Sequence, residues 1–255
     1  MSRDRPARLP WWAEAVALFA LYQLFEYLRT LVVGRSGPAL RHARGVVHVE
    51  RWLRLYPEPG LNAAVSAHTA VAQAMDIYYG TIHFVVPPLV LWWLWRRQPD
   101  EYTRWRNVLI AVSVAGLILF ALYPLAPPRL TTGITAHFVD TAVRFGGLGP
   151  LDRGNFVDKN PYAAMPSLHM AWSGWCAMAV IVGGRAGRRP APAWRWLMLA
   201  YPAATLTVVM GTANHWLLDG VAGVVLLVAA CAILDAARVP GTEEVRTDGE
   251  IRTPQ

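Results

Sequence analysis

Apolar segments of about 20 residues recur along the whole chain and constrain its fold more than any other feature. Short stretches rich in arginine separate them, and we predict that six of these segments cross a membrane as helices. The six segments cover about residues 11–33, 77–96, 107–126, 166–184, 196–213 and 216–237. Only 16% of the 255 residues are charged, against about 25% in a typical soluble domain. The sequence therefore predicts an all-α, polytopic membrane protein.

The region before the second apolar segment is less regular. Residues 61–76 include His68 and Asp76 among apolar positions, and Pro87 and Pro88 interrupt the segment that follows. We predict an added interfacial helix over 61–76, lying on the membrane surface. A longer, tilted span across the same region is an alternative that the pattern leaves open.

A single membrane-embedded domain is predicted over residues 1–238, because no linker or internal repeat interrupts the series of apolar segments. Residues 239–255 are polar and contain few large apolar side chains, which is typical of a disordered tail. Cys176 and Cys231 both lie inside apolar segments. We therefore expect them to be buried by packing rather than joined in a disulfide or bound to a metal.

The distribution of arginine predicts the orientation in the membrane. With the N-terminus inside, the inner segments hold 14 arginines and the longer outer segments hold nine basic residues. Because positive residues are enriched on the cytoplasmic side, we expect both termini in the cytoplasm, with the plasma membrane as the simplest location. The basic residues do not form one patch, so the net charge of +7 does not indicate a nucleic-acid partner.

Three polar motifs fall at one predicted face of the membrane. The third segment ends there in "YPLAPPRL", the fourth begins there with "MPSLH", and the fifth returns there to "GTANHWLLDG". Three motifs from separate segments at one face indicate a shared site, which we expect to face outward. The residues that the motifs contribute are Arg129, Ser167, His169, His215 and Asp219.

These residue types fit phosphoryl transfer. His215 and Asp219 are spaced i, i+4 on one helix face, and a carboxylate at one ring nitrogen leaves the other free as nucleophile or base. Arg129 offers a guanidinium that matches phosphate oxygens. Ser167 and His169 lie at a helix start, where free backbone N–H groups attract anions. We interpret the set as a phosphohistidine site in which one histidine attacks and the other protonates the departing oxygen.

Each of these residues also has a simpler explanation when it is taken alone. His169 fits an interfacial histidine, His215 and Asp219 fit a structural hydrogen bond or a pair of metal ligands, and Arg129 fits a contact with lipid headgroups. The motifs supply no carboxylate cluster for Mg²⁺ and no third ligand for a catalytic Zn²⁺. The sequence therefore predicts that neither a metal nor a cofactor is required.

Other polar positions in the apolar segments are harder to assign. Four of them could line a substrate groove or equally belong to a structural network: Asp76, Tyr79, His83 and Asn214. Glu26 and Arg29 fit an i, i+3 pair within the first segment, whereas the sequence suggests no partner for Glu14.

With these motifs, the chain resembles the type 2 phosphatidic acid phosphatase superfamily of membrane enzymes, whose motifs are Lys-x6-Arg-Pro, Pro-Ser-Gly-His and Ser-Arg-x5-His-x3-Asp. Residues 166–169 read Pro-Ser-Leu-His here, and the third motif retains His215 and Asp219. The resemblance covers about residues 75–237. It implies a six-helix core and metal-independent chemistry, with His215 as nucleophile, Asp219 as its orienting group and His169 as general acid.

The departures from the family motifs indicate a branch. Leu122 and Leu130 stand where the first motif has lysine and proline, and Val208 and Val209 stand where the third has Ser-Arg. The stretches "PPRL", "AAMPSLH" and "ANHWLLD" are more similar to the branch that includes inositol phosphorylceramide synthases, which moves a phosphoinositol headgroup between lipids. Loss of two cations weakens the capture of a terminal phosphomonoester, which favours a phosphodiester donor and hence transfer.

Three functions remain open at this point. The first is headgroup transfer between membrane phospholipids, and the second is hydrolysis of a lipid phosphate or prenyl diphosphate. The third is a non-catalytic transporter or scaffold with the same fold. The intact His169, His215 and Asp219 favour the two enzymes over the third function.

Overall fold

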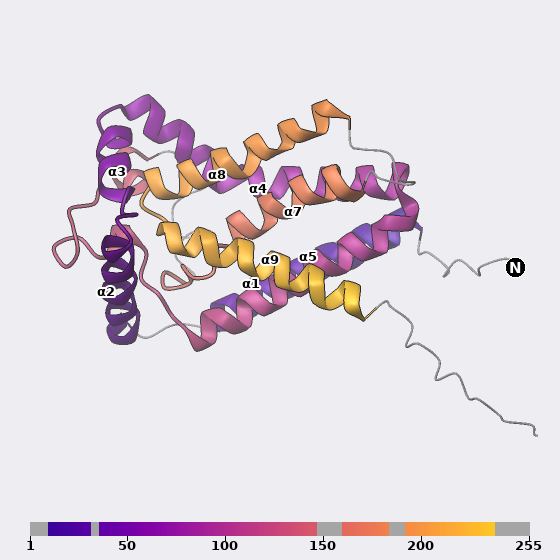
Figure 1. Cartoon of the computed structure of the whole chain (residues 1–255), viewed down its shortest axis with the longest axis horizontal. Coiled ribbons are helices and arrows are strands. Elements are labelled where there is room, and N and C mark those ends of the chain that lie inside the picture. The colour runs from indigo at the N-terminus through magenta and orange to yellow at the C-terminus, as the bar shows by residue number, and fades with distance from the viewer. Residues whose placement is uncertain (1–9, 32–35, 147–159, 184–191, 238–255) are drawn as a thin grey trace, which may run out of the picture.

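The computed structural model describes residues 10–31, 36–146, 160–183 and 192–237, and these residues form helices joined by turns (Figure 1). The α-helices are α1 (Trp11–Leu31), α2 (Ser36–Trp52), α3 (Glu58–Ser66), α4 (Thr69–Arg97), α5 (Pro99–Leu122), α6 (Thr141–Phe145), α7 (Leu168–Gly183), α8 (Ala200–Gly211) and α9 (Leu217–Ala236). Two 3₁₀ segments are η1 (Pro128–Leu130) and η3 (Ala193–Leu199). The tail predicted at 239–255 lies outside the described residues.

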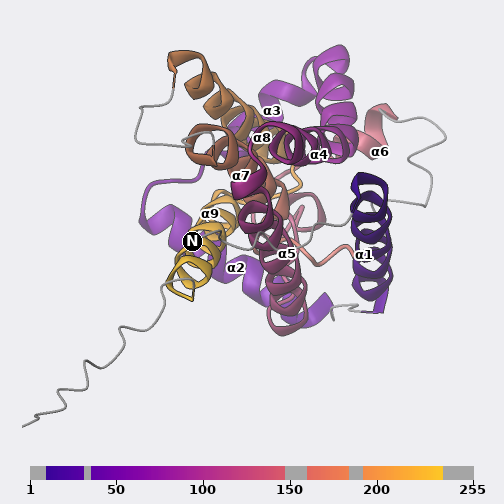
Figure 2. The ribbon, with the colours of Figure 1, turned by 90° about the vertical axis from the view of Figure 1, so that its right-hand side faces the viewer.

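Helix α7 lies at the centre of the bundle and packs against α4, α5, α8 and α9. The long helices run alongside one another, and α2 and α3 lie across one end of them (Figure 1). Figure 2 shows α1 at the outer edge of the bundle, where it packs against α5. The start of α7 therefore faces the end of the bundle that α2 and α3 cover.

Small residues allow the central helices to approach closely. Trp105 and Trp175 are fully buried, and the indole N–H of Trp175 donates to the carbonyl oxygen of Trp105 at 2.9 Å. A side chain on Gly183 would press on the Trp105 indole, and one on Gly223 would clash with the backbone oxygen of Ser167. The glycine in α9 thus brings that helix against the first turn of α7, where the motif residues begin.

Three described helices, α4, α5 and α9, are each long and apolar enough to cross a membrane. Helices α1 and α2 meet the same criterion only as a joined pair, and α7 is a shorter apolar helix. This pattern fits the predicted integral membrane protein with an all-helical fold. The number of six spans stays a prediction.

The predicted boundaries around the second segment were wrong. Helix α3 ends at Ser66 and α4 begins at Thr69, so the stretch 61–76 is divided between two helices rather than forming one. Pro87 and Pro88 lie inside α4 without ending it. Packed membrane helices tolerate proline because neighbouring groups bond the carbonyls that it frees. The observed α4 is therefore closer to the longer span that the sequence pattern left open.

Helix α2 was not predicted, because its charged side chains made residues 36–52 resemble an outer loop. Its buried face is built from small and β-branched residues at helical spacing, namely Ala39, Ala43, Val46 and Val47. These side chains belong to the same buried cluster as Leu125, which precedes η1, and Trp216, which precedes α9. The helix therefore supports the site from behind.

Candidate active site

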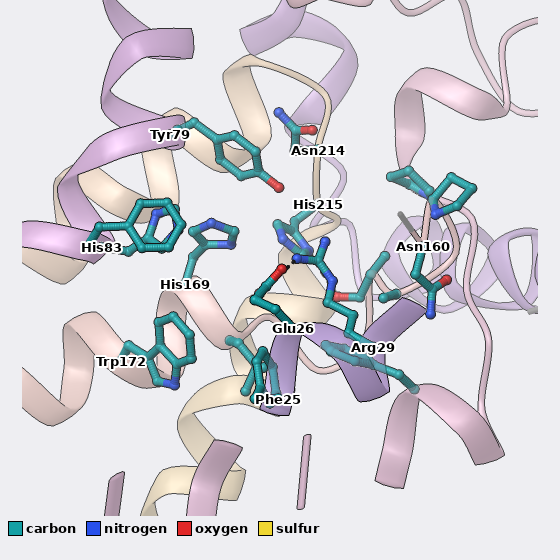
Figure 3. A pocket seen from close by; sticks show the side chains of 18 of the residues that line it. Phe25, Glu26, Arg29, Tyr79, His83, Asn160, His169, Trp172, Asn214 and His215 are labelled. Atoms are coloured by element: carbon teal, nitrogen blue, oxygen red, sulfur yellow. Dashed lines mark hydrogen bonds and ion pairs between the residues drawn. The ribbon is translucent and has the colours of Figure 1, made fainter. Parts of the chain in front are cut away.

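A pocket lies between α1, α4, the first turn of α7 and the segments that precede η1 and α9 (Figure 3). The predicted site residues that line it are Tyr79, His83, Arg129, His169, Asn214 and His215. The structure thus brings the three sequence motifs together in one cavity. Asp219 lies directly behind His215, whereas Ser167 and Asp76 are not among the lining residues.

His215 sits in the turn between α8 and α9, and its ring is held from one side. Its Nδ1 is 2.9 Å from the carbonyl oxygen of Ala164 and 3.3 Å from Oδ2 of Asp219. A carbonyl oxygen can only accept, so Nδ1 carries the proton and donates to Ala164. The Nε2 atom then keeps its lone pair, which is the requirement for a nucleophilic histidine.

The protonation of His215 follows from its surroundings. Burial is the main cause that lowers its pKa to about 3, and the positive charge of Arg129 lowers it further. The imidazole is therefore neutral at physiological pH. A neutral ring with its proton on Nδ1 is ready to attack without first losing a proton.

Asp219 has two contacts in the first turn of α9. Its Oδ2 accepts the backbone N–H of Trp216 at 2.9 Å and also lies near Nδ1 of His215. The predicted pairing of His215 with Asp219 is therefore present, but the nearer acceptor is the Ala164 carbonyl. A backbone acceptor has no signature in the sequence, which is why Ala164 was missed.

His169 faces the same pocket from the first turn of α7. Its ring centroid lies 5.6 Å from that of His215, 4.4 Å from that of Tyr79 and 4.7 Å from that of His83. Figure 3 shows the labelled rings grouped around one space. The two motif histidines therefore line the same cavity as near neighbours.

Arg129 is anchored beside the turn that carries His215. Its backbone N–H donates to the carbonyl oxygen of Ala213 at 3.0 Å, and its guanidinium bonds the side-chain oxygen of Asn214. Its Nε lies 3.5 Å from a carboxylate oxygen of Asp140. Only 9% of the side chain is exposed, so the guanidinium is held in place at the pocket wall.

Ser167 and Asp76 have structural contacts instead of a place in the pocket. Ser167 is fully buried, and its hydroxyl oxygen accepts the backbone N–H of Met170 as a cap on α7. Asp76 accepts from the Thr141 hydroxyl at 2.7 Å, which turns it toward α6. The predicted groove therefore forms without Asp76, and the phosphate contact of Ser167 stays a prediction.

Two carboxylates that the sequence did not signal hold the start of α9. Glu58 on α3 accepts the backbone N–H of Leu217 at 2.6 Å, and Glu50 on α2 accepts that of Leu218 at 2.9 Å. Both glutamates are fully buried, and burial raises the pKa of Glu58. They satisfy N–H groups that a helix N-terminus leaves free, and so fix the helix that follows His215.

Helix α1 supplies two further charged groups to the pocket, Glu26 and Arg29. Their side chains pair at 3.5 Å, as the i, i+3 spacing predicted. At the other end of α1, Glu14 pairs with Arg106 at 2.6 Å, the partner that the sequence did not reveal. Asn160, just before the second motif, also lines the pocket.

Comparison with known proteins gives two matches. The pattern of the PAP2 superfamily matches residues 44–233, a range that contains every motif residue of the pocket but not α1. Phosphoinositol dihydroceramide synthase from Bacteroides thetaiotaomicron is 27% identical over 185 residues, which cover 66% of this chain and 55% of that protein. The chain thus spans about half the length of this relative. No solved structure matches this chain.

Proposed function

Because the chain belongs to the PAP2 superfamily, we propose that it is a membrane enzyme that transfers a phospho-headgroup from one lipid to another through a phosphohistidine on His215. The family and the named relative support a lipid phosphotransferase or phosphatase. The observation that carries the mechanism is the geometry of His215. Its Nδ1 donates to the carbonyl oxygen of Ala164, which leaves the Nε2 lone pair free, and its side chain lines the same pocket as His169.

The reaction has two balanced steps. The Nε2 lone pair of His215 forms a bond to phosphorus while the bond from phosphorus to the lipid oxygen breaks, and protonated His169 gives its proton to that oxygen. Neutral His169 then takes the proton of an incoming lipid hydroxyl, whose oxygen attacks phosphorus and displaces His215. The headgroup has moved, and both histidines return to their starting states. Water in place of the lipid hydroxyl makes the same enzyme a phosphatase.

Transfer from a phosphodiester is the branch of this chemistry that the pocket favours. Leu122 and Val209, which replace the family's lysine and arginine, add no charge, and neither lines the pocket.

Among the described residues, no group of three or more His, Cys, Asp or Glu side chains could hold a metal ion. We therefore expect full activity in excess EDTA, and loss of activity with rescue by a divalent ion would contradict the scheme.

The leaving group of the substrate tests the two histidine roles. We expect His215→Ala to abolish turnover and any trapped phospho-enzyme with every substrate. His169→Ala should slow release of a lipid alkoxide far more than release of p-nitrophenolate, because a good leaving group needs little protonation. Turnover is measured on matched lipid and p-nitrophenyl phosphodiesters. Rescue of His215→Ala, and not of His169→Ala, by the activated substrate would exchange the roles.

We also propose that the pocket opens to the outer face of the membrane. The charge count along the sequence supports this orientation. Single cysteines at the exposed His137, which follows the third predicted span, and at the exposed Ala193, in η3, report it because the native Cys176 and Cys231 are buried. We expect an impermeant thiol reagent to label His137→Cys and not Ala193→Cys in intact cells. The opposite labelling would invert the topology.

A further inference from the structure

Helix α1 forms one wall of the pocket although it lies outside the range that the family pattern matches. Contacts along its length hold it there. Glu14 pairs with Arg106 at one end, and near the pocket the Phe25 ring lies 6.2 Å from that of Trp172. The Tyr22 ring meets that of Phe84 edge to face at 5.8 Å. These contacts direct the next turn of α1 into the pocket.

The charges at the pocket wall are few. Among the described lining residues, the charged side chains are Glu26, Arg29 and Arg129. Arg129 is already bonded to Asn214 and close to Asp140. Arg29 instead has its ion pair with Glu26 at 3.5 Å, a distance too long for a normal N–H···O bond. Its N–H donors are therefore not committed by that contact.

The direction of Arg29 fits a ligand site. Figure 3 shows its side chain extending from α1 toward His215, with the dashed line to Glu26 beside it. The Arg29 side chain is 25% exposed and that of Glu26 is 15% exposed, so both groups lie at the cavity rather than in the core. A guanidinium in this place can donate two parallel bonds to phosphate oxygens.

We propose that Arg29 binds the substrate phosphate in place of the cations missing at Leu122 and Val209, and that Glu26 restricts the site to singly charged phosphodiesters. This inference rests on the proposed function, since it concerns the phosphate that His215 attacks. A phosphomonoester carries about −1.5 to −2 charges at pH 7, whereas a diester carries one. Glu26 repels the second charge, while one negative charge is still attracted by Arg29 and Arg129 together.

Variants of Arg29 test the phosphate contact. We expect Arg29→Gln to lower kcat/KM for phosphatidylinositol by roughly 10- to 100-fold, as loss of a charged hydrogen bond predicts. It should weaken inhibition by orthovanadate in parallel, and Arg29→Lys should recover part of both. Because Arg29→Gln leaves Glu26 unpaired, the neutral pair Glu26→Gln/Arg29→Gln is measured as well. It should remain impaired on phosphatidylinositol.

Glu26→Gln alone tests the charge restriction. We expect it to raise the ratio of kcat/KM for phosphatidic acid to that for phosphatidylinositol by about fivefold or more, because one repulsive charge is removed. Tyr27→Phe, an exposed change on the same helix, and Arg144→Gln, an exposed arginine on α6, are the controls and should leave both values unchanged.

The outcomes separate this inference from the function on which it rests. An active parent enzyme with unchanged catalysis and vanadate inhibition in Arg29→Gln would overturn the phosphate contact alone. An unchanged substrate ratio in Glu26→Gln would overturn the charge restriction. A parent protein that forms no product and no phospho-enzyme from either lipid, yet melts cooperatively, would overturn the proposed function and this inference with it.

Discussion

Two pairs of charged residues from the N-terminal helices lie close to the candidate active site, and the two pairs make different contacts. Glu50 and Glu58, from α2 and α3, are sealed in the core, and each accepts one backbone N–H at the start of α9. Glu26 and Arg29, from α1, stand at the pocket and contact each other loosely. The first pair holds the start of the helix that follows His215, and the second lines the pocket.

The role of an acidic residue is therefore set by its burial and by its hydrogen-bond partner, since all of these carboxylates have the same chemistry. A buried carboxylate that accepts a backbone N–H stabilises a helix terminus, and its removal leaves a donor without a partner. A carboxylate that pairs with a guanidinium at a cavity changes the local charge, and its removal leaves no backbone N–H without an acceptor. The variants below test this contrast, beginning with the residue that links the two sides.

Substitution of Asp219 should have the largest effect on activity, because this residue is fully buried at the start of α9 and lies beside His215. Asp219→Asn keeps an oxygen that can accept the Trp216 N–H but removes the negative charge near the ring. We expect kcat to fall by roughly 10²–10⁴, by analogy with the orienting carboxylate of a serine protease triad. The melting temperature in detergent should change little. A fall in kcat of less than threefold would mean that Ala164 alone orients the ring.

Alanine substitutions should separate the two pairs by stability. Glu58→Ala leaves the buried N–H of Leu217 unsatisfied, which costs about 1–3 kcal/mol. Glu26→Ala removes a partly buried group that accepts no backbone N–H in the described structure, and it should change the free energy of unfolding by about 0.5 kcal/mol or less. Thermal unfolding of both purified variants measures this. Equal losses would show that α1 is as structural as α3.

The pH dependence of stability should show a smaller effect of the sealed pair. Because burial raises the pKa of Glu58 above 4.5 in the folded protein, its contribution to stability is complete below about pH 4.5 and is lost as the pH rises through the folded pKa. Glu58→Gln keeps an acceptor for Leu217 and cannot ionise. We expect its melting temperature to fall less between pH 4.5 and 8 than that of the parent. An identical slope would place the pH dependence on other groups.

The motif residues of the site could be predicted because their spacing and chemistry are visible in one dimension. His215 and Asp219 are one turn apart, Arg129 follows the end of the third segment, and His169 lies at the start of the fourth, at the same predicted face. Ala164 could not be found in this way, because it acts through its carbonyl oxygen and any residue has one.

The two buried glutamates, Glu50 and Glu58, and the helix boundaries could not be predicted from the sequence for a related reason. Glu50 and Glu58 occur in a stretch with many charges, so their sequence resembles a surface segment, and their burial depends on packing against α9. The break at Ala67 and His68 also carries no glycine or proline to mark it. Long apolar periodicity predicted the existence of the α4 span but not where the helix begins.

The direct bond between α7 and α9 has a consequence for how the site responds to its membrane. The backbone N–H of Ser167 donates to the carbonyl oxygen of Asp219 at 2.9 Å, and Gly223 lets the two main chains touch beside it. Helices tilt when the surrounding bilayer is thinner than their apolar length. When these helices tilt, the ends far from this hydrogen bond move most. His169 and His215 lie close in sequence to the two bonded residues, so they move least. We therefore expect the distance between the His169 and His215 rings to depend little on bilayer thickness.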